Sequence, residues 1–526
     1  MLFNSYIFIF IFFPMCITGF YALATWHSDM AAKIWVIGFS LWFYGFFSPA
    51  YLIIMLASIG VNYVLIVLMD RFDEKPGRRG FLITGVTLNL LLLGYFKYLD
   101  FTIGNINTLF GSDIPMRNIL LPLGISFFTF QQIGYLVDIY RRDEVKPAFV
   151  DYALFVSFFP QLVAGPIVSG REMMPQFATI AGRRPDPERI GRGLTLFVLG
   201  LAKKVLIADA FGRAVDSGYS QIGTIGGLDS FLVMIWYTLQ LYYDFSGYCD
   251  MAMGLAGMLG FDLPLNFDSP YKAHNIVDFW RRWHMTLTRF FTRYVYIPLG
   301  GSRVSKARTI VNILIVYFLS GLWHGAGWNF VLWGMLHGIA YAVVRIGAWH
   351  HYKNVTESRN NSVMVPGTNA GTNAATATAA ADAATATGSK PLRILSHIAT
   401  FLYVSFAWVF FRAASITEAM SLIKNMFTGT WNSVNYALAD AFVQIDELWY
   451  VVKFSGLPGV NFTLAHNLVM IVFTLAVLVM TFAAPNAYTV SKKLRPRAIT
   501  AVLIGALGLW CVLSLSEVST FLYFNF

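Results

Sequence analysis

Long apolar stretches recur along almost the whole chain, and they constrain its fold more than any other feature. The chain is 57% hydrophobic and only 13% charged, which is far from the composition of soluble domains. Since backbone groups in lipid must hydrogen-bond internally, helices are favoured over irregular segments. The apolar stretches cover residues 6–25, 34–47, 49–69, 81–98, 117–139, 149–168, 190–208, 226–243, 248–261, 309–320, 328–347, 395–411, 464–484 and 498–517.

This pattern predicts an all-α polytopic membrane protein. Several stretches are shorter than the roughly 20 residues that cross the hydrocarbon core, so we expect about 11 to 13 transmembrane or re-entrant helices. Residues 149–168 contain two prolines and a glycine, which exclude a straight, uninterrupted helix there. Residues 353–392 hold an Ala/Thr-rich run and are predicted to be a disordered loop. The loop would separate a core, residues 1–352, from C-terminal transmembrane helices, residues 393–526.

The net charge of +10 is concentrated between the apolar stretches. Basic loops next to membrane spans are typical of the cytoplasmic side, so the charge does not indicate nucleic-acid binding. The three cysteines all lie inside apolar stretches, and their spacing predicts neither a disulfide framework nor a metal site. The basic clusters cover residues 71–79, 141–146, 183–192, 281–308 and 492–497.

The first candidate site is His324, in the segment Gly-Leu-Trp-His-Gly-Ala-Gly-Trp-Asn-Phe of residues 321–330. An ionisable side chain at membrane depth is costly and is expected where it faces a polar cavity or a reaction. The flanking glycines remove side chains from around the imidazole, and Trp323 and Trp328 are expected to form walls. The alternative is a histidine hydrogen-bonded between packed helices with no chemical role.

The second candidate site lies in residues 278–294. Read as one helix, this segment is amphipathic, with an aromatic side and an arginine-rich side, as in helices that lie at a membrane surface. We expect Arg281, Arg282 and Arg289 to meet the phosphates of a cytoplasmic donor while His284 points inward. The alternative is a basic aromatic belt that only anchors the protein.

Charged residues elsewhere in the apolar stretches give weaker signals. Lys203 and Lys204 are expected either to reach the headgroups or to bind an anionic ligand. Asp244 and Asp250 are six residues apart, about 240° around a helix, so they do not predict a catalytic pair.

Seven segments together closely resemble the membrane-bound O-acyltransferase (MBOAT) family. Within the family, the likeness is greatest to bacterial alginate O-acetylase membrane subunits and to relatives that acetylate cellulose or peptidoglycan. Any one segment is a weak signal, but their number and order make the resemblance specific. The segments cover residues 121–131, 158–167, 237–251, 279–284, 296–301, 321–325 and 408–413.

The resemblance implies an acetyltransferase of the bacterial inner membrane with the MBOAT fold and its central funnel. His324 matches the family's active-site histidine and His284 its supporting histidine. Acetyl-CoA would enter from the cytoplasm as a substrate, with no resident cofactor, and acetyl would leave outside for O-acetylation of an exopolysaccharide, alginate-like or cellulose. Such relatives work with periplasmic or membrane-anchored SGNH/esterase-like partners. The chain lacks a Gly-x-Ser-x-Gly nucleophile elbow of its own.

Other functions remain open from the sequence. Within the family, the acceptor could be peptidoglycan, or the acyl group could be D-alanine passed to teichoic acid. A proton-coupled transporter would use His324, His337, Asp244 and Asp250 as a path, although no inverted repeat is visible. A noncatalytic scaffold for polymer export fits the composition but leaves both histidine segments unexplained.

Overall fold

The computed structural model describes residues 1–26, 28–72, 75–360, 390–443, 446–456, 459, 461–494, 497–515 and 521–522. Within these ranges the regular structure consists of helices, without a β-strand, which confirms the prediction of an all-α protein. The chain forms two compact units. Unit 1 comprises Met1–Ala210, Gln240–Asn266 and Pro485–Phe526, and unit 2 comprises Phe211–Leu239 and Phe267–Ala484.

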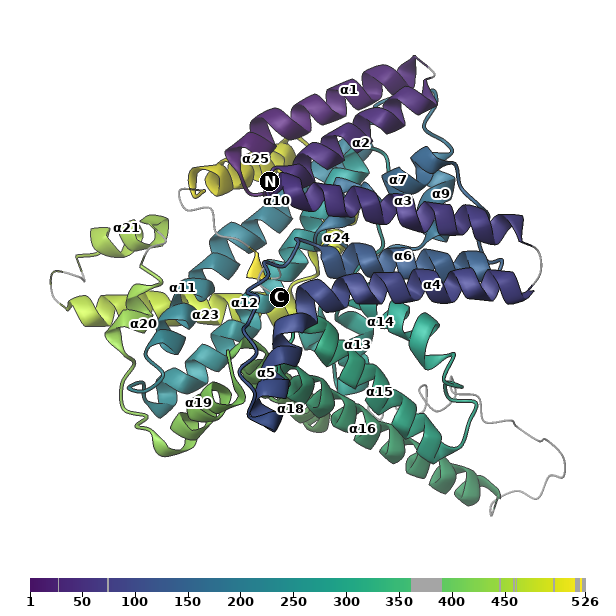
Figure 1. Ribbon diagram of the computed structural model, residues 1–526. Coiled ribbons are helices and arrows are strands. Elements are labelled where there is room, and N and C mark those ends of the chain that lie inside the picture. The colour runs from purple at the N-terminus through teal and green to yellow at the C-terminus, as the bar shows by residue number, and fades with distance from the viewer. Residues whose placement is uncertain are drawn as a thin grey trace. The chain divides into compact units, whose positions relative to one another are not determined.

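Unit 1 contains most of the N-terminal helices and the second part of the long α12. In it, α3, α4 and α6 pack side by side (Figure 1). Its elements are η1 (Phe8–Phe12), α1 (Phe13–Thr25), α2 (Asp29–Gly45), α3 (Pro49–Arg71), α4 (Lys75–Leu93), η2 (Gly94–Tyr98), α5 (Leu99–Phe110), α6 (Ile125–Tyr140), α7 (Phe149–Ser157), α8 (Phe159–Leu162), α9 (Gly170–Phe177), α10 (Pro187–Ala202), η3 (Lys203–Ala208), α12 (Gly227–Met258), α24 (Ala487–Lys493) and α25 (Ala498–Leu513).

Unit 2 contains the first part of α12 and both histidine segments. Its other elements are α11 (Asp209–Ser220), η4 (Pro270–Lys272), α13 (Ile276–Arg282), α14 (Met285–Phe291), η5 (Thr292–Tyr296), α15 (Lys306–His324), α16 (Trp328–Asn360), α18 (Lys390–Arg412), α19 (Ile416–Thr428), α20 (Tyr436–Asp440), α21 (Asp446–Phe454) and α23 (Phe462–Ala483). The core of the loop predicted at 353–392, residues 361–389, lies outside the described residues. Each unit draws on chain from both sides of that loop.

Seven helices in the described part of the chain are long and apolar enough to cross a membrane. They cover Phe8–Thr25, Pro49–Arg71, Pro76–Phe110, Lys306–His324, Trp328–His350, Pro391–Arg412 and Phe462–Ala483. The helix Ala498–Leu513 is apolar but shorter. The predicted count of 11 to 13 transmembrane or re-entrant helices included such shorter segments. This count and the central funnel stay predictions.

The interruption predicted in residues 149–168 is confirmed. α7 ends at Ser157, and Phe158 leaves helical geometry with a ψ of 104°. The short α8 then begins with Pro160 in its first turn, where a missing N–H costs nothing. Residues from Val163 onward continue as a turn rather than as a helix, so this apolar stretch is buried protein and not one straight span.

Lys203 and Lys204 of unit 1 both form ion pairs, and Lys204 is buried. Lys204 Nζ lies 2.7 Å from Asp244 Oδ1 and 2.9 Å from Asp209 Oδ1, and Lys203 Nζ lies 2.6 Å from Asp250 Oδ2. Both expectations for these lysines, headgroup contact and an anionic ligand, are therefore replaced by an internal network. The pairs join η3 to α12, because a buried charge is stable only with a partner.

In unit 2, α15 and α16 form a closely packed helical hairpin (Figure 1). A Cβ atom on Gly321 would lie 2.4 Å from the carbonyl oxygen of Phe330, and one on Gly334 would lie 2.3 Å from that of Tyr317. Glycine is therefore required for the two backbones to approach this closely. The hairpin turn places the end of α15, and with it His324, beside the first turns of α16.

Candidate active site

His324 is the last residue of α15 and is only 3% exposed. Its ring makes edge-to-face contacts with Trp333 of α16, at a centroid distance of 5.0 Å, and with Phe411 of α18, at 5.2 Å. Trp323 packs against it at 4.7 Å. The imidazole therefore lies in an aromatic enclosure built by three helices. Trp323 is one wall, as predicted, whereas Trp328 is 56% exposed.

The end of α18 is fixed at this enclosure by Asn329. The buried Asn329 amide donates to the backbone carbonyl oxygens of Phe410, at 3.3 Å, and of Ala413, at 2.8 Å. These carbonyls lie at the C-terminus of a helix, where intrahelical donors are lacking. Asn329 thus couples the start of α16 to the residues around Phe411, which contacts His324.

His284 lies at a sharp break between α13 and α14. Its φ of 44° and ψ of 51° place it in the left-handed region, where non-glycine residues are uncommon. The prediction of one continuous amphipathic helix over residues 278–294 was therefore wrong. The pattern assigned side chains to the faces of a straight helix, whereas the left-handed turn directs His284 into the protein. The imidazole is fully buried, in agreement with the expectation that it points inward.

The two predicted histidines come together in unit 2. Their ring centroids lie 6.3 Å apart, and the His284 ring also contacts Trp323 at 6.0 Å. Burial lowers the pKa of His284 well below its ordinary value, so this imidazole is neutral at physiological pH. Two imidazoles at this separation can contact the same small substrate group from two sides. Such an arrangement suits proton transfer or nucleophilic attack shielded from bulk water.

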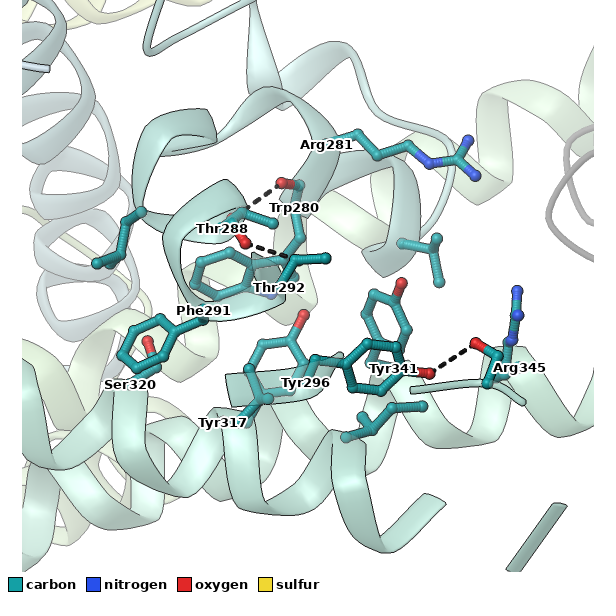
Figure 2. Close-up of a pocket in the computed structure, with 15 residues that line it drawn as sticks. Trp280, Arg281, Thr288, Phe291, Thr292, Tyr296, Tyr317, Ser320, Tyr341 and Arg345 are labelled. Carbon is teal, nitrogen blue, oxygen red and sulfur yellow. Dashed lines mark hydrogen bonds between the residues drawn. The ribbon is translucent and has the colours of Figure 1, made fainter. Parts of the chain in front are cut away.

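A cavity of about 300 Å³ lies next to this pair, between α13, α14, η5, α15 and α16 (Figure 2). Ser320, four residues before His324, contributes to its wall, as does Leu287, three residues after His284. Aromatic and aliphatic side chains make up most of the remaining lining, with several hydroxyl groups among them. In Figure 2, Phe291 and Ser320 lie on one side of the view.

Arg281 and Arg345 lie on the other side of the same view (Figure 2). These two residues bring guanidinium groups to the cavity, and none of the described residues that line it carries a carboxylate. The three arginines predicted from the sequence have different surroundings. Arg281 lines the cavity, Arg282 pairs with Asp278 at 2.9 Å, and the exposed Arg289 is not among the lining residues.

Sequence reasoning missed Arg345, which is only 6% exposed although it belongs to a membrane-spanning helix. A buried arginine in such a helix was itself a detectable signal. Trp333 and Trp408 could not be singled out from the sequence, because a buried tryptophan in an apolar helix is usually part of the core. His337, which was noted only as part of a transporter path, contacts both tryptophans, at centroid distances of 5.1 Å and 5.9 Å.

The carboxylates and cysteines noted in the sequence do not form a second site in the described ranges. Asp244 and Asp250 belong to the ion pairs of unit 1, and the three cysteines are free and buried. No group of three or more histidine, cysteine or acidic side chains in the described residues has the proximity needed to hold a metal ion.

Comparison with known proteins adds independent information. Residues 138–346 match the model of the membrane-bound O-acyltransferase family. The chain is 35% identical to a peptidoglycan O-acetyltransferase of Helicobacter pylori, over 100% of this chain and 98% of that protein. It is 34% identical to a probable alginate O-acetylase of Pseudomonas aeruginosa, over 82% of this chain and 76% of that protein.

A more distant relative is a teichoic acid D-alanyltransferase of Streptococcus thermophilus, which is 29% identical over 48% of this chain and 63% of its own length. The matched family region contains both buried histidines and every residue that lines the cavity. The chain is therefore a membrane protein that belongs to the membrane-bound O-acyltransferase family, and it is an acyltransferase.

Proposed function

We propose that this enzyme takes acetyl from cytoplasmic acetyl-CoA and passes it across the bacterial inner membrane for O-acetylation of an exopolysaccharide, alginate-like or cellulose. One observation carries the proposal: His324 and His284 lie 6.3 Å apart inside a buried aromatic enclosure. In an acyltransferase of this family, two such imidazoles are the groups best suited to acyl transfer. The funnel expected from the family would supply the path.

The chemistry follows from the properties of imidazole. As a general base, His324 would remove the proton of an acceptor hydroxyl while its oxygen attacks the acetyl carbonyl and the CoA thiol leaves. As a nucleophile, it would hold the acetyl group on nitrogen and then release it to the hydroxyl. Both routes require that water be excluded, because water would otherwise hydrolyse the thioester. The aromatic side chains around His324 support that exclusion.

The cavity supports a nucleotide-bearing donor. Two guanidinium groups suit the phosphates of CoA, since arginine binds phosphate in a fixed bidentate geometry. The aromatic lining suits an apolar or stacked portion of the donor. Ser320 is one helical turn from His324, so a donor whose phosphates meet Arg281 and Arg345 would extend toward the histidines.

This assignment predicts a donor-binding defect in the variant Arg345→Gln. We expect the KM for acetyl-CoA to rise about tenfold or more with a smaller change in kcat, because a lost charged hydrogen bond weakens binding by that order. Arg308→Gln is the matched control, since Arg308 is exposed near the start of α15 and does not line the cavity. Equal KM values for the two variants would place the donor phosphates elsewhere.

A second protein is expected to complete the transfer to polymer. The chain lacks a nucleophile elbow, and an SGNH/esterase-like partner, periplasmic or membrane-anchored, would provide the serine nucleophile. In that arrangement this chain delivers acetyl to the outer side of the membrane and its partner selects the polymer hydroxyl.

Peptidoglycan is the second candidate acceptor. It is favoured by the full-length correspondence with a peptidoglycan O-acetyltransferase, whereas the alginate O-acetylase aligns with 82% of the chain. D-alanyl transfer has less support, because the teichoic acid relative aligns with about half of the chain.

Release of ester-linked groups by mild alkali tests these acceptors. After deletion of the gene, we expect acetate to be lost from secreted polysaccharide, while acetate on peptidoglycan and D-alanine on the envelope stay unchanged. Complementation with the intact gene controls for indirect effects. Loss of acetate from peptidoglycan alone would establish the second candidate. Loss of D-alanine with acetate preserved would contradict acetyl transfer altogether.

A further inference from the structure

His337 is a buried polar side chain to which the proposed reaction assigns no role. It lies in a membrane-spanning helix, α16, and is 0% exposed. A histidine at such a position is costly unless its polar atoms are used. Its ring is surrounded by aromatic side chains: Phe279 and Trp280 of α13, Trp333 of the same helix, and Tyr403 and Trp408 of α18.

The polar contact of His337 is with Trp280. The indole Nε1–H of Trp280 donates to His337 Nδ1 at 3.3 Å. An accepting Nδ1 carries no hydrogen, so the neutral imidazole holds its proton on Nε2. Among the described residues Nε2 has no hydrogen-bond partner. Among the described residues, the hydrogen bond that Nδ1 accepts from Trp280 is therefore the polar contact of this histidine.

Trp280 occupies a critical place in the site. With Tyr317, whose ring lies 5.3 Å away, it forms part of the wall of the cavity. It also contacts Trp333 at 5.9 Å, and Trp333 in turn contacts His324 at 5.0 Å. The Trp280 indole therefore belongs to the wall of the cavity and, through Trp333, is linked to the aromatic enclosure of His324. A rotation of this ring would alter both.

We propose that His337 is a positioning residue, whose Nδ1 holds the Trp280 indole in place in the wall of the cavity, where Trp333 links it to His324. Indole can rotate about two side-chain bonds, and the apolar contacts around it do not select one ring orientation as sharply as a hydrogen bond does. A fixed wall would keep the acyl end of the donor at one distance from His324. Small misplacements of reacting groups reduce rates strongly. This role rests on the proposed acetyl transfer.

A pair of variants of similar size separates positioning from packing. His337→Asn retains an acceptor near the position of Nδ1, whereas His337→Leu fills a comparable volume without one. We expect the Leu variant to lose about tenfold in kcat/KM for acetyl-CoA, mostly in kcat, and the Asn variant to recover most of that loss. Equal losses in the two variants would show that His337 contributes only packing.

A double-mutant cycle tests the partnership with Trp280. Trp280→Phe removes the donor, so the double variant Trp280→Phe/His337→Leu should be no less active than Trp280→Phe alone. If the loss of activity in the double variant equals the product of the losses in the two single variants, the proposal is contradicted. All variants are compared at equal amounts of monodisperse protein in detergent, which separates altered activity from failed folding.

One readout does not depend on activity. In protein with ¹⁵N-labelled histidine, the NMR signal of His337 is the one that is missing from the spectrum of His337→Asn. We expect this signal to report a neutral ring protonated on Nε2. We also expect it to shift in Trp280→Phe. An unshifted signal would overturn the proposal even if the enzyme is active. If the wild-type protein releases no CoA from acetyl-CoA but the signal shifts as expected, the proposed function fails while the hydrogen bond stands.

Discussion

The conformation of His284 could not be predicted from its sequence. The residues around it have the spacing of an amphipathic helix, and nothing in that pattern marks a residue with positive φ. Histidine tolerates the left-handed region better than β-branched residues, but the break is stabilised by tertiary packing. Trp283, for example, packs against Phe267 at 4.9 Å and Trp408 at 5.0 Å. The identity and the inward direction of the histidine were predictable, and its backbone was not.

Burial of His284 predicts a dependence of stability on pH. His284 lies outside the seven spans, and burial lowers its pKa in the folded protein. Below about pH 6.5 the unfolded chain binds a proton there that the folded protein does not. The free energy of unfolding should therefore fall as the pH drops below that value, by up to about 1.4 kcal/mol per pH unit from this group.

Thermal unfolding in detergent between pH 7.5 and 5.5 measures the effect. The comparison is with His284→Asn, since asparagine also tolerates a positive φ and does not titrate in this range. We expect the difference in unfolding temperature between wild type and variant to narrow or reverse as the pH falls. A difference that is constant across this range would contradict a buried, neutral His284.

At the scale of helices, the sequence predicted where apolar segments lie and break better than it predicted which residues they contact. Residues 149–168 were expected to break because two prolines, Pro160 and Pro166, and a glycine lie inside this apolar stretch, and the break was confirmed. Lys204 was expected to meet headgroups or a ligand. Its two carboxylates, Asp209 and Asp244, are 5 and 40 residues away, and no local pattern links residues at the larger separation.

The buried pair of Lys204 and Asp244 predicts a large loss of stability when one partner is removed. Each side chain is only 2% exposed, so Lys204→Met takes a buried cation away from the buried Asp244 carboxylate. We expect a loss of about 3 to 5 kcal/mol, seen as a much lower unfolding temperature. The backbone N–H of Leu522 also donates to Asp244, at 3.0 Å, so the C-terminal residues should loosen too.

An exposed pair on α10 supplies the control. Arg192 and Glu188 form an ion pair one helical turn apart, with side chains 52% and 58% exposed. Arg192→Met should cost about 0.5 kcal/mol or less, because solvent screens such pairs. Similar unfolding temperatures for Arg192→Met and Lys204→Met would show that the buried network contributes little to folding.

At the scale of the whole molecule, the sequence predicted the all-helical class and the family, and both are confirmed. It also pointed to two histidines that the structure brings together, and their catalytic role stays a prediction. These predictions were possible because membrane insertion and acyl transfer each require particular residue types at particular places, which short segments preserve. The cavity was not predictable, since its lining comes from elements between Val277 and Arg345 whose packing is set by tertiary structure. Arg345 illustrates this point, because its role depends on the position of Arg281 on another helix.

The role of His324 is tested most directly by measuring acetyl transfer in the variant His324→Ala. Purified wild-type protein is mixed with acetyl-labelled acetyl-CoA, and both CoA release and label on protein or acceptor are followed. We expect turnover by the wild type and a loss of at least about a thousandfold in the variant, which should still accumulate in the membrane as folded protein. Turnover by His324→Ala at the wild-type rate would show that His324 does not carry out the transfer.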